Sequence, residues 1–200
     1  MFVQMMEGQV RDADRLQQQM DRWLRDLMPG AVGYLGSTGG VTDAGDSIMM
    51  ARFATEADAR RNSDRPEQGA WWADTEACFD GPVRFHESTD VTVMSHGDAD
   101  QARFVQVMEG HVSDREAARR LDEQADELLA RARPDLIESI TAYFDDGGFT
   151  DISYFRTEEE AREAEQRGFP TEMAATFAEW EATMKVERFL DLRDPWLASA

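Results

Sequence analysis

Cysteine and long apolar runs are scarce in this sequence of 200 residues. Cys78 is the only cysteine, so no disulfide can form within the chain. No run of about 18 apolar residues occurs, which argues against a membrane-spanning helix. The first residues lack a basic region followed by an apolar core, so we expect no secretory signal. These absences together predict a cytoplasmic protein.

Basic residues are also few. The chain has 21 Lys and Arg residues against 41 Asp and Glu residues, and its net charge is −20. An acidic field repels phosphate backbones and anionic lipid surfaces, so we expect neither nucleic acid nor a membrane as partner. The three histidines show no spacing with Cys, Asp or Glu that is typical of zinc ligands, and we predict no metal site.

The chain contains an internal repeat. Residues 2–12 return as residues 104–114, with eight of eleven positions identical, and residues 52–60 match residues 154–162 at the same offset of 102. Internal repeats decide the fold and therefore come before other patterns. We expect one repeat in residues 1–94, a polar linker in residues 95–103, and a second repeat with a C-terminal tail in residues 104–200.

Each repeat shows the same order of elements. Alternating apolar residues predict strands, and apolar residues at helical spacing predict helices, in the order strand, helix, strand, strand, helix, strand, with the second helix broken in two. This βαββαβ order is the ferredoxin-like split βαβ arrangement, an antiparallel sheet of four strands with helices on one face. The expected strands are residues 2–10, 31–39, 47–54 and from 83 onward, then 104–112, 136–144, 149–156 and 185–192.

The strands carry apolar residues on both faces, as Phe2 and Met6 alternate with Val3 and Met5. The helices cover one face, and a second copy of the sheet is the obvious cover for the other. The predicted fold is therefore α+β, with two ferredoxin-like repeats packed sheet to sheet as an intramolecular barrel. A monomer with a pseudo-twofold axis follows, and further dimerisation stays open.

The doubled element order, the two Phe-Val-Gln-x-Met-Glu-Gly strands and the helix with Trp71-Trp72-Ala73-Asp74-Thr75-Glu76 resemble the dimeric α/β-barrel superfamily. Within it, the chain is similar to a fused form of the antibiotic biosynthesis monooxygenase-like proteins. The resemblance implies a cavity between sheet and helices for a small molecule. The superfamily includes oxygenases that act on aromatic polyketides without metal or flavin, haem-degrading enzymes and proteins with no known reaction, and we expect no cofactor here. Haem-degrading members use a histidine on the tryptophan helix, and residues 67–79 and 171–183 contain none.

Four residues are candidates for ligand binding. Trp71 and Trp72 are adjacent on a helix, so their side chains point about 100° apart, and the alternative is that both are core residues. Arg52 and its repeat counterpart Tyr154 lie on central strands. We expect the pocket in the first repeat, which has the richer set of aromatic and polar residues.

Three residues are candidates for a catalytic base. Glu7 and Glu109 occupy equivalent places on central strands, where burial would raise the carboxyl pKa, and Arg52 is a possible partner of Glu7. His86 is the third candidate. The alternative for the two glutamates is that they lie in water at strand ends beside Gly8 and Gly110.

The sequence leaves three functions open. The first is a cofactor-independent monooxygenase-like enzyme for a small aromatic or polyketide-like compound, which needs a base and an apolar pocket. The second is a non-catalytic ligand-binding or stress-related barrel. The third is an interaction scaffold.

Overall fold

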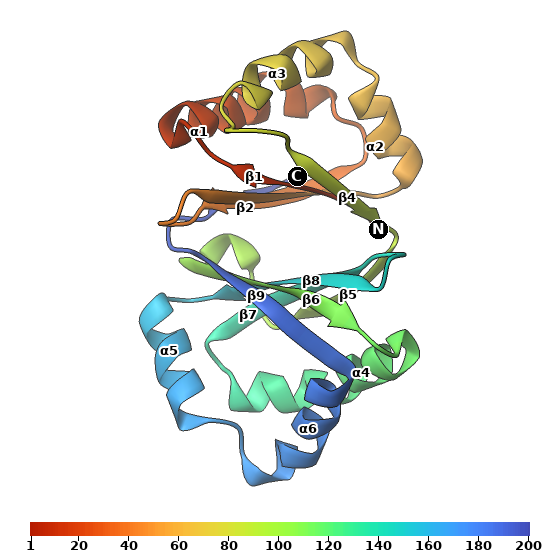
Figure 1. The fold of residues 1–200 in the computed structure, drawn as a ribbon, viewed down its shortest axis with the longest axis vertical. Coiled ribbons are helices and arrows are strands. Elements are labelled where there is room, and N and C mark those ends of the chain that lie inside the picture. Colours follow the sequence, from red (N-terminus) through yellow and green to blue (C-terminus); the bar gives the residue numbers. More distant parts are fainter. The chain divides into compact units, whose positions relative to one another are not determined.

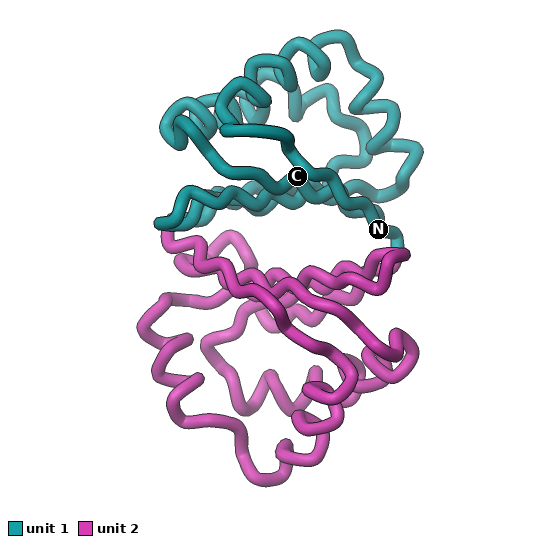
Figure 2. Tube along the Cα trace, viewed as in Figure 1, with its two compact units in different colours: residues 1–89, 194–200 teal, residues 90–193 magenta.

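The computed structural model describes all 200 residues, Met1–Ala200. The chain forms two compact units (Figure 2): unit 1 comprises Met1–Thr89 and Asp194–Ala200, and unit 2 comprises Asp90–Arg193. Each unit has one antiparallel sheet of five strands with helices on one face (Figure 1), so the fold is α+β as predicted. None of the helices combines the length and the apolar character that crossing a membrane requires.

The sheet of unit 1 has the strand order β10-β2-β3-β1-β4. Its first helix begins at a cap, where the Asp12 carboxylate accepts a hydrogen bond from the backbone N–H of Arg15 (3.0 Å), and Thr55 caps the second helix in the same way through the N–H of Asp58 (3.1 Å). The strands are β1 (Phe2–Gln9), β2 (Tyr34–Val41), β3 (Asp46–Phe53), β4 (Arg84–Ser88) and β10 (Trp196–Ser199); the helices are α1 (Ala13–Arg22), which continues as a π-helical turn (Trp23–Leu27) and a 3₁₀ turn (Met28–Gly30), α2 (Glu56–Ser63) and α3 (Pro66–Glu76).

The sheet of unit 2 has the strand order β5-β7-β8-β6-β9. Two of its helices again begin at side-chain caps, Asp114 and Thr157. The strands are β5 (Asp90–Ser95), β6 (Phe104–Val112), β7 (Leu136–Tyr143), β8 (Gly148–Phe155) and β9 (Met184–Leu192); the helices are α4 (Arg115–Ala132), α5 (Glu158–Arg167) and α6 (Ala174–Thr183), with 3₁₀ turns at Ala99–Gln101 and Thr171–Met173.

The central strands of the two units pair in the same register. Phe2 lies opposite Phe53 in unit 1, and Phe104 lies opposite Phe155 in unit 2, which are the same positions at an offset of 102. The hairpins β2–β3 and β7–β8 share this offset, and each has a register shift near its start. Residues at an offset of 102 on these strands therefore occupy equivalent places.

The sheet edges differ from the expected four-stranded arrangement. Residues 83 to 93 do not form one strand, because β4 ends at Ser88 in the sheet of unit 1 and β5 pairs with β7 in unit 2. The C-terminal strand β10 conversely joins the sheet of unit 1, where it pairs with β2 at the edge. An edge strand offers unpaired N–H and C=O groups, and these added strands satisfy them. The expected bounds, with repeats in 1–94 and 104–200 and a linker in 95–103, describe the repeat in the sequence. They stay a prediction.

Both faces of each sheet are apolar, as expected. In unit 1, Phe2 and Phe53 pack under Trp23 and Trp71 on the helix side, while Val3, Met5, Ile48 and Met50 are buried on the opposite side. The alternation follows from the two-residue period of a strand. That the two sheets close a barrel by packing on each other stays a prediction.

Candidate functional site

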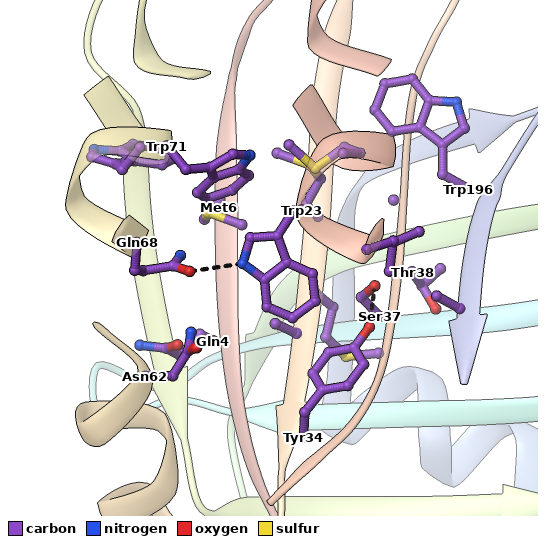
Figure 3. Close-up of a pocket in the computed structure, with 18 of the residues that line it drawn as sticks. Gln4, Met6, Trp23, Tyr34, Ser37, Thr38, Asn62, Gln68, Trp71 and Trp196 are labelled. Atoms are coloured by element: carbon purple, nitrogen blue, oxygen red, sulfur yellow. Dashed lines mark hydrogen bonds between the residues drawn. The ribbon is translucent and has the colours of Figure 1, made fainter. Parts of the chain in front are cut away.

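Unit 1 contains a cavity of about 310 Å³ between its sheet and its helices (Figure 3). Its walls are mostly aromatic and apolar, and none of the lining residues carries a charge. The aromatic lining residues are Trp23, Tyr34, Phe53, Trp71, Trp72, Phe85 and Trp196.

Hydrogen bonds hold several of these rings in place. The Trp23 indole N–H donates to the Gln68 side-chain oxygen (2.7 Å), and the Tyr34 hydroxyl donates to Ser37 Oγ (2.7 Å). The Trp71 indole N–H donates to the backbone carbonyl of Gln19 (2.8 Å). The cavity of unit 1 is thus an ordered aromatic pocket without an acid or a base in its wall.

Unit 2 contains a larger cavity of about 740 Å³, lined by its sheet and by residues of α4, α5 and α6. Phe155, Phe169, Phe177 and Trp180 contribute aromatic wall. Unlike the cavity of unit 1, this one has carboxyl groups in its lining, from Asp122, Asp151, Glu165 and Glu181.

Asp151 on β8 lies under the helices and is 5% exposed. Its carboxyl oxygens accept hydrogen bonds from the hydroxyls of Ser139 (2.5 Å), Thr141 (2.8 Å) and Ser153 (2.6 Å). Burial raises the pKa of Asp151, and the three hydroxyl hydrogen bonds oppose that rise. The partners of this carboxyl are therefore all neutral.

Asp122 on α4 is the second buried carboxyl group in the cavity, also 5% exposed. Burial raises its pKa to about 6, the hydrogen bond from the Tyr143 hydroxyl (2.7 Å) opposes the rise, and the charge of Asp151 adds to it. Burial and the neighbouring Asp122 also raise the pKa of Tyr143, so the phenol keeps its proton. A carboxylate with a pKa near neutrality inside a cavity is suited to be a general base.

The acidic groups of unit 2 have no counterpart in unit 1. At an offset of 102, Asp122 corresponds to Met20 and Asp151 corresponds to Met49. Thr141 and Ser153 likewise correspond to Gly39 and Ala51, and all four residues of unit 1 line its cavity. The same location in the fold is therefore apolar in one unit and acidic in the other.

The two tryptophans expected to bind a ligand, Trp71 and Trp72, both line the cavity of unit 1. Trp71 is 4% exposed and belongs to the hydrophobic core, so it also fills the structural role considered as the alternative. Arg52 and Tyr154 line neither cavity, because the strand period turns them to the sheet face opposite the helices.

The residues expected as bases, Glu7, Glu109 and His86, also line neither cavity. Glu7 is buried and accepts a hydrogen bond from Arg84 (2.9 Å), with the His86 ring 3.9 Å away. Arg52 lies opposite Val3, four positions along β1 from Glu7. In unit 2, Glu109 accepts a hydrogen bond from Arg188 (3.1 Å). The two glutamates thus take part in equivalent ion pairs between neighbouring strands, not in a cavity site.

Sequence reasoning missed Asp122 and Asp151. The signal for Asp122 was a carboxylate at the position of Met20, an apolar residue of α1 that packs against the core of unit 1. The signal for Asp151 was the exchange of Met49 for a carboxylate in the middle of a central strand. Both exchanges become visible once the two repeats are aligned at an offset of 102.

No protein-family model matches the sequence, and no curated protein matches it. Solved structures do match over nearly the whole chain. A candidate monooxygenase from Lactobacillus acidophilus has a TM-score of 0.71 at 11% identity and covers 99% of both chains. A candidate monooxygenase from Fusobacterium nucleatum has a TM-score of 0.75 at 7% identity, with 99% of this chain and 94% of that chain covered. An anthrone oxidase-like protein has a TM-score of 0.63 at 7% identity, with 100% and 94% covered.

These identities are low, so the likeness concerns the fold. It extends over both units, and it confirms the fused ferredoxin-like architecture that the resemblance to antibiotic biosynthesis monooxygenase-like proteins implied. Because one fold can support many activities, the chemistry of this chain depends on the residues that line its two cavities.

Proposed function

We propose that this chain is a cofactor-independent monooxygenase-like enzyme that oxidises a small aromatic or polyketide-like compound in the cavity of unit 2. The observation that carries the proposal is Asp122, a buried carboxyl group with a pKa of about 6 in the wall of a cavity that also contains aromatic rings, hydroxyls and charged side chains. The names of the similar structures, two candidate monooxygenases and an anthrone oxidase-like protein, support the same class of reaction.

The first step requires a substrate with an acidic C–H bond, such as the methylene group of an anthrone. Asp122 takes the proton, and the remaining electron pair spreads over the fused rings and the carbonyl group. Because a pKa of about 6 leaves Asp122 mostly ionised at neutral pH while keeping it more basic than an ordinary Asp, the group is available as base under cellular conditions.

Dissolved oxygen is the oxidant in the second step. The carbanion transfers one electron to O₂, and the resulting radical and superoxide combine into a peroxide that takes the proton back from Asp122. Loss of water from this hydroperoxide then gives a carbonyl group. The balance is one CH₂ group and one O₂ converted into one C=O group and one water molecule.

The other residues of the cavity hold the substrate and exclude water. Phe155, Phe177 and Trp180 offer ring faces and edges to an aromatic substrate. The hydroxyls of Ser139, Thr141 and Ser153 line the cavity and donate their protons to Asp151, so toward a substrate they offer acceptor oxygens that match a phenolic hydroxyl group. Tyr143 fixes the Asp122 carboxylate through its hydrogen bond.

The test is oxygen uptake by the purified protein with anthrone and related hydroxyaromatic compounds, measured with an oxygen electrode. We expect Asp122→Asn to lower kcat at least about hundredfold, within the range for loss of a general base. The matched control is Asp126→Asn, one turn further along α4, where the carboxylate contacts the His96 ring (3.2 Å) and does not line the cavity. We expect its kcat to equal that of the parent protein.

The pH dependence gives a second readout. Since the base must be ionised, kcat/KM should rise with pH through the pKa of Asp122, about 6, and level off above it. Equal rates for the parent protein and Asp122→Asn, or no uptake with any compound, would leave the non-catalytic ligand-binding protein as the better interpretation. That alternative is favoured by one observation, the uncharged cavity of unit 1.

A further inference from the structure

We propose that the cavity of unit 1 is a second binding site, which holds an uncharged, planar aromatic carboxamide or ketone and does not convert it. The inference goes beyond the function proposed for unit 2, because it concerns another cavity with a different lining. It rests on the aromatic walls, on the amide groups at one end of the cavity and on the absence of charge from the lining.

The walls fit a flat aromatic molecule. Four of the five tryptophans of the chain line this cavity, Trp23, Trp71, Trp72 and Trp196. The Trp72 and Phe85 rings contact each other edge to face with centroids 5.1 Å apart, so their exposed faces and edges form a continuous aromatic surface. A volume of about 310 Å³ is near the lower limit for small-molecule sites, roughly 300 Å³, and favours a compact ligand.

Three amide side chains, Gln4, Asn62 and Gln68, lie at one end of the cavity (Figure 3). The Gln68 oxygen accepts from Trp23 and the Asn62 oxygen accepts from Arg65 (3.0 Å), which leaves the NH₂ groups of both side chains as donors. The Gln4 NH₂ group donates to Glu87 (2.9 Å), which leaves its oxygen as an acceptor. A ligand carbonyl matches the two donors, and the N–H of a carboxamide matches the acceptor.

The lining also decides against a charged ligand. A carboxylate in this cavity would lose its water and gain no cationic partner, because the cavity contains no Arg, Lys or His. The net charge of −20 adds repulsion at longer range. Discrimination between a carboxamide and a carboxylate of the same shape is therefore the sharpest expected property of this site.

The residues that differ between the two units explain why we expect no conversion of the ligand in unit 1. The places of Asp122 and Asp151 are held by Met20 and Met49, so the wall offers no group that takes a proton from the ligand. Unit 1 is thereby assigned to recognition and unit 2 to chemistry.

The test compares naphthalene-2-carboxamide with naphthalene-2-carboxylate by isothermal titration calorimetry on the full chain. We expect the carboxamide to bind at least about a hundredfold more tightly than the carboxylate. The location is read from the indole N–H signals of ¹⁵N-labelled protein, each assigned by a Trp→Phe variant. The carboxamide should shift the signals of Trp23, Trp72 and Trp196 and leave Trp180, which lines the cavity of unit 2, unchanged.

Two variants and one control test the residues. Ala51→Leu fills the cavity of unit 1 and should abolish carboxamide binding. Ala125→Leu, the control, narrows the cavity of unit 2 and should leave carboxamide binding unchanged. Gln68→Leu removes a donor without filling the core, so it should weaken binding roughly tenfold even if Ala51→Leu does not fold.

Three results would overturn the proposal: equal affinity for the carboxylate, a shift confined to the Trp180 signal, or unchanged binding in Gln68→Leu. Because calorimetry detects binding without oxygen consumption, its outcome is independent of whether unit 2 oxidises any compound. Failure of the oxidation assay and failure of this proposal are therefore separate results.

Discussion

The buried carboxyl group of Asp122 should make the protein less stable at neutral pH than at acidic pH, and Asp122→Asn should remove this cost. Asn keeps the shape of the side chain and an oxygen that can accept from the Tyr143 hydroxyl, but it carries no charge. The variant therefore isolates the ionisation of one group from the packing around it.

The magnitude follows from the pKa. The folded protein holds the pKa of Asp122 at about 6, against 3.8 for the unperturbed group. Each unit of difference corresponds to about 1.4 kcal/mol, so the full cost of ionising Asp122 is on the order of 3 kcal/mol. A carboxyl whose pKa is raised by folding binds more protons when folded than when unfolded. Stability is therefore lost as pH rises from about 4 to about 6, and the loss is complete above the folded pKa.

The assay is urea unfolding followed by circular dichroism, at a series of pH values between about 4 and 8. The free energy of unfolding of Asp122→Asn should equal that of the parent protein near pH 4 and exceed it by up to about 3 kcal/mol above pH 6. Asp126→Asn removes a carboxylate from the same helix whose side chain is about half exposed, and it serves as the matched control. A difference between Asp122→Asn and the parent that does not change with pH, or that has the opposite sign, would refute the assignment of Asp122 as a buried ionisable group.

Three further predictions concern stability, each measured as a change in the urea midpoint or in Tm. Arg84→Ala should destabilise unit 1 by about 1–3 kcal/mol, because it removes the guanidinium that donates to the buried Glu7 carboxylate at 2.9 Å. Arg84→Lys should recover part of the loss, and an unchanged Tm would show that this ion pair is dispensable. Leu121→Ala should lower the free energy of unfolding by about 2–5 kcal/mol, since Leu121 is fully buried beside the cavity of unit 2. A loss below about 1 kcal/mol would mean that the side chain of Leu121 is already loosely packed. Thr157→Ala should lower the free energy of unfolding by about 1 kcal/mol, because it removes the side-chain cap of α5. Thr157→Ser keeps the hydroxyl and should cost little, so equal losses in the two variants would argue against the cap.

Much of the fold could be predicted because it depends on local patterns that occur twice. The strand period, the capping residues and the turns at Gly45 (φ +83°) and Gly147 (φ +87°) are all local features, and each appears at an offset of 102. The edges could not be predicted in this way. Whether Asp90–Ser95 continues β4 or joins β7 depends on which sheet edge is open, and that information is not local.

The candidate site was only partly predictable for a similar reason. Trp71 and Trp72 stood out because large aromatic residues mark cavities as well as cores. Glu7 and Glu109 stood out because they are repeated carboxylates on central strands, but their partners Arg84 and Arg188 lie about 80 residues away in sequence, so the ion pairs required the structure. Asp122 and Asp151 are unremarkable among 41 acidic residues until their burial is known.

The reciprocal placement of β5 and β10 bears on how such a chain can be divided. A fragment that ends after Gln101 would keep β5 without the strand β7 that it pairs with, and it would lack β10 at the edge of its own sheet. A fragment that begins at Ala102 would have the converse defect. Each half would carry one unsatisfied edge and one orphan strand, the condition that promotes strand swapping between copies. The gene is thus expected to tolerate a circular permutation that keeps both strand pairs together better than a cut into two halves.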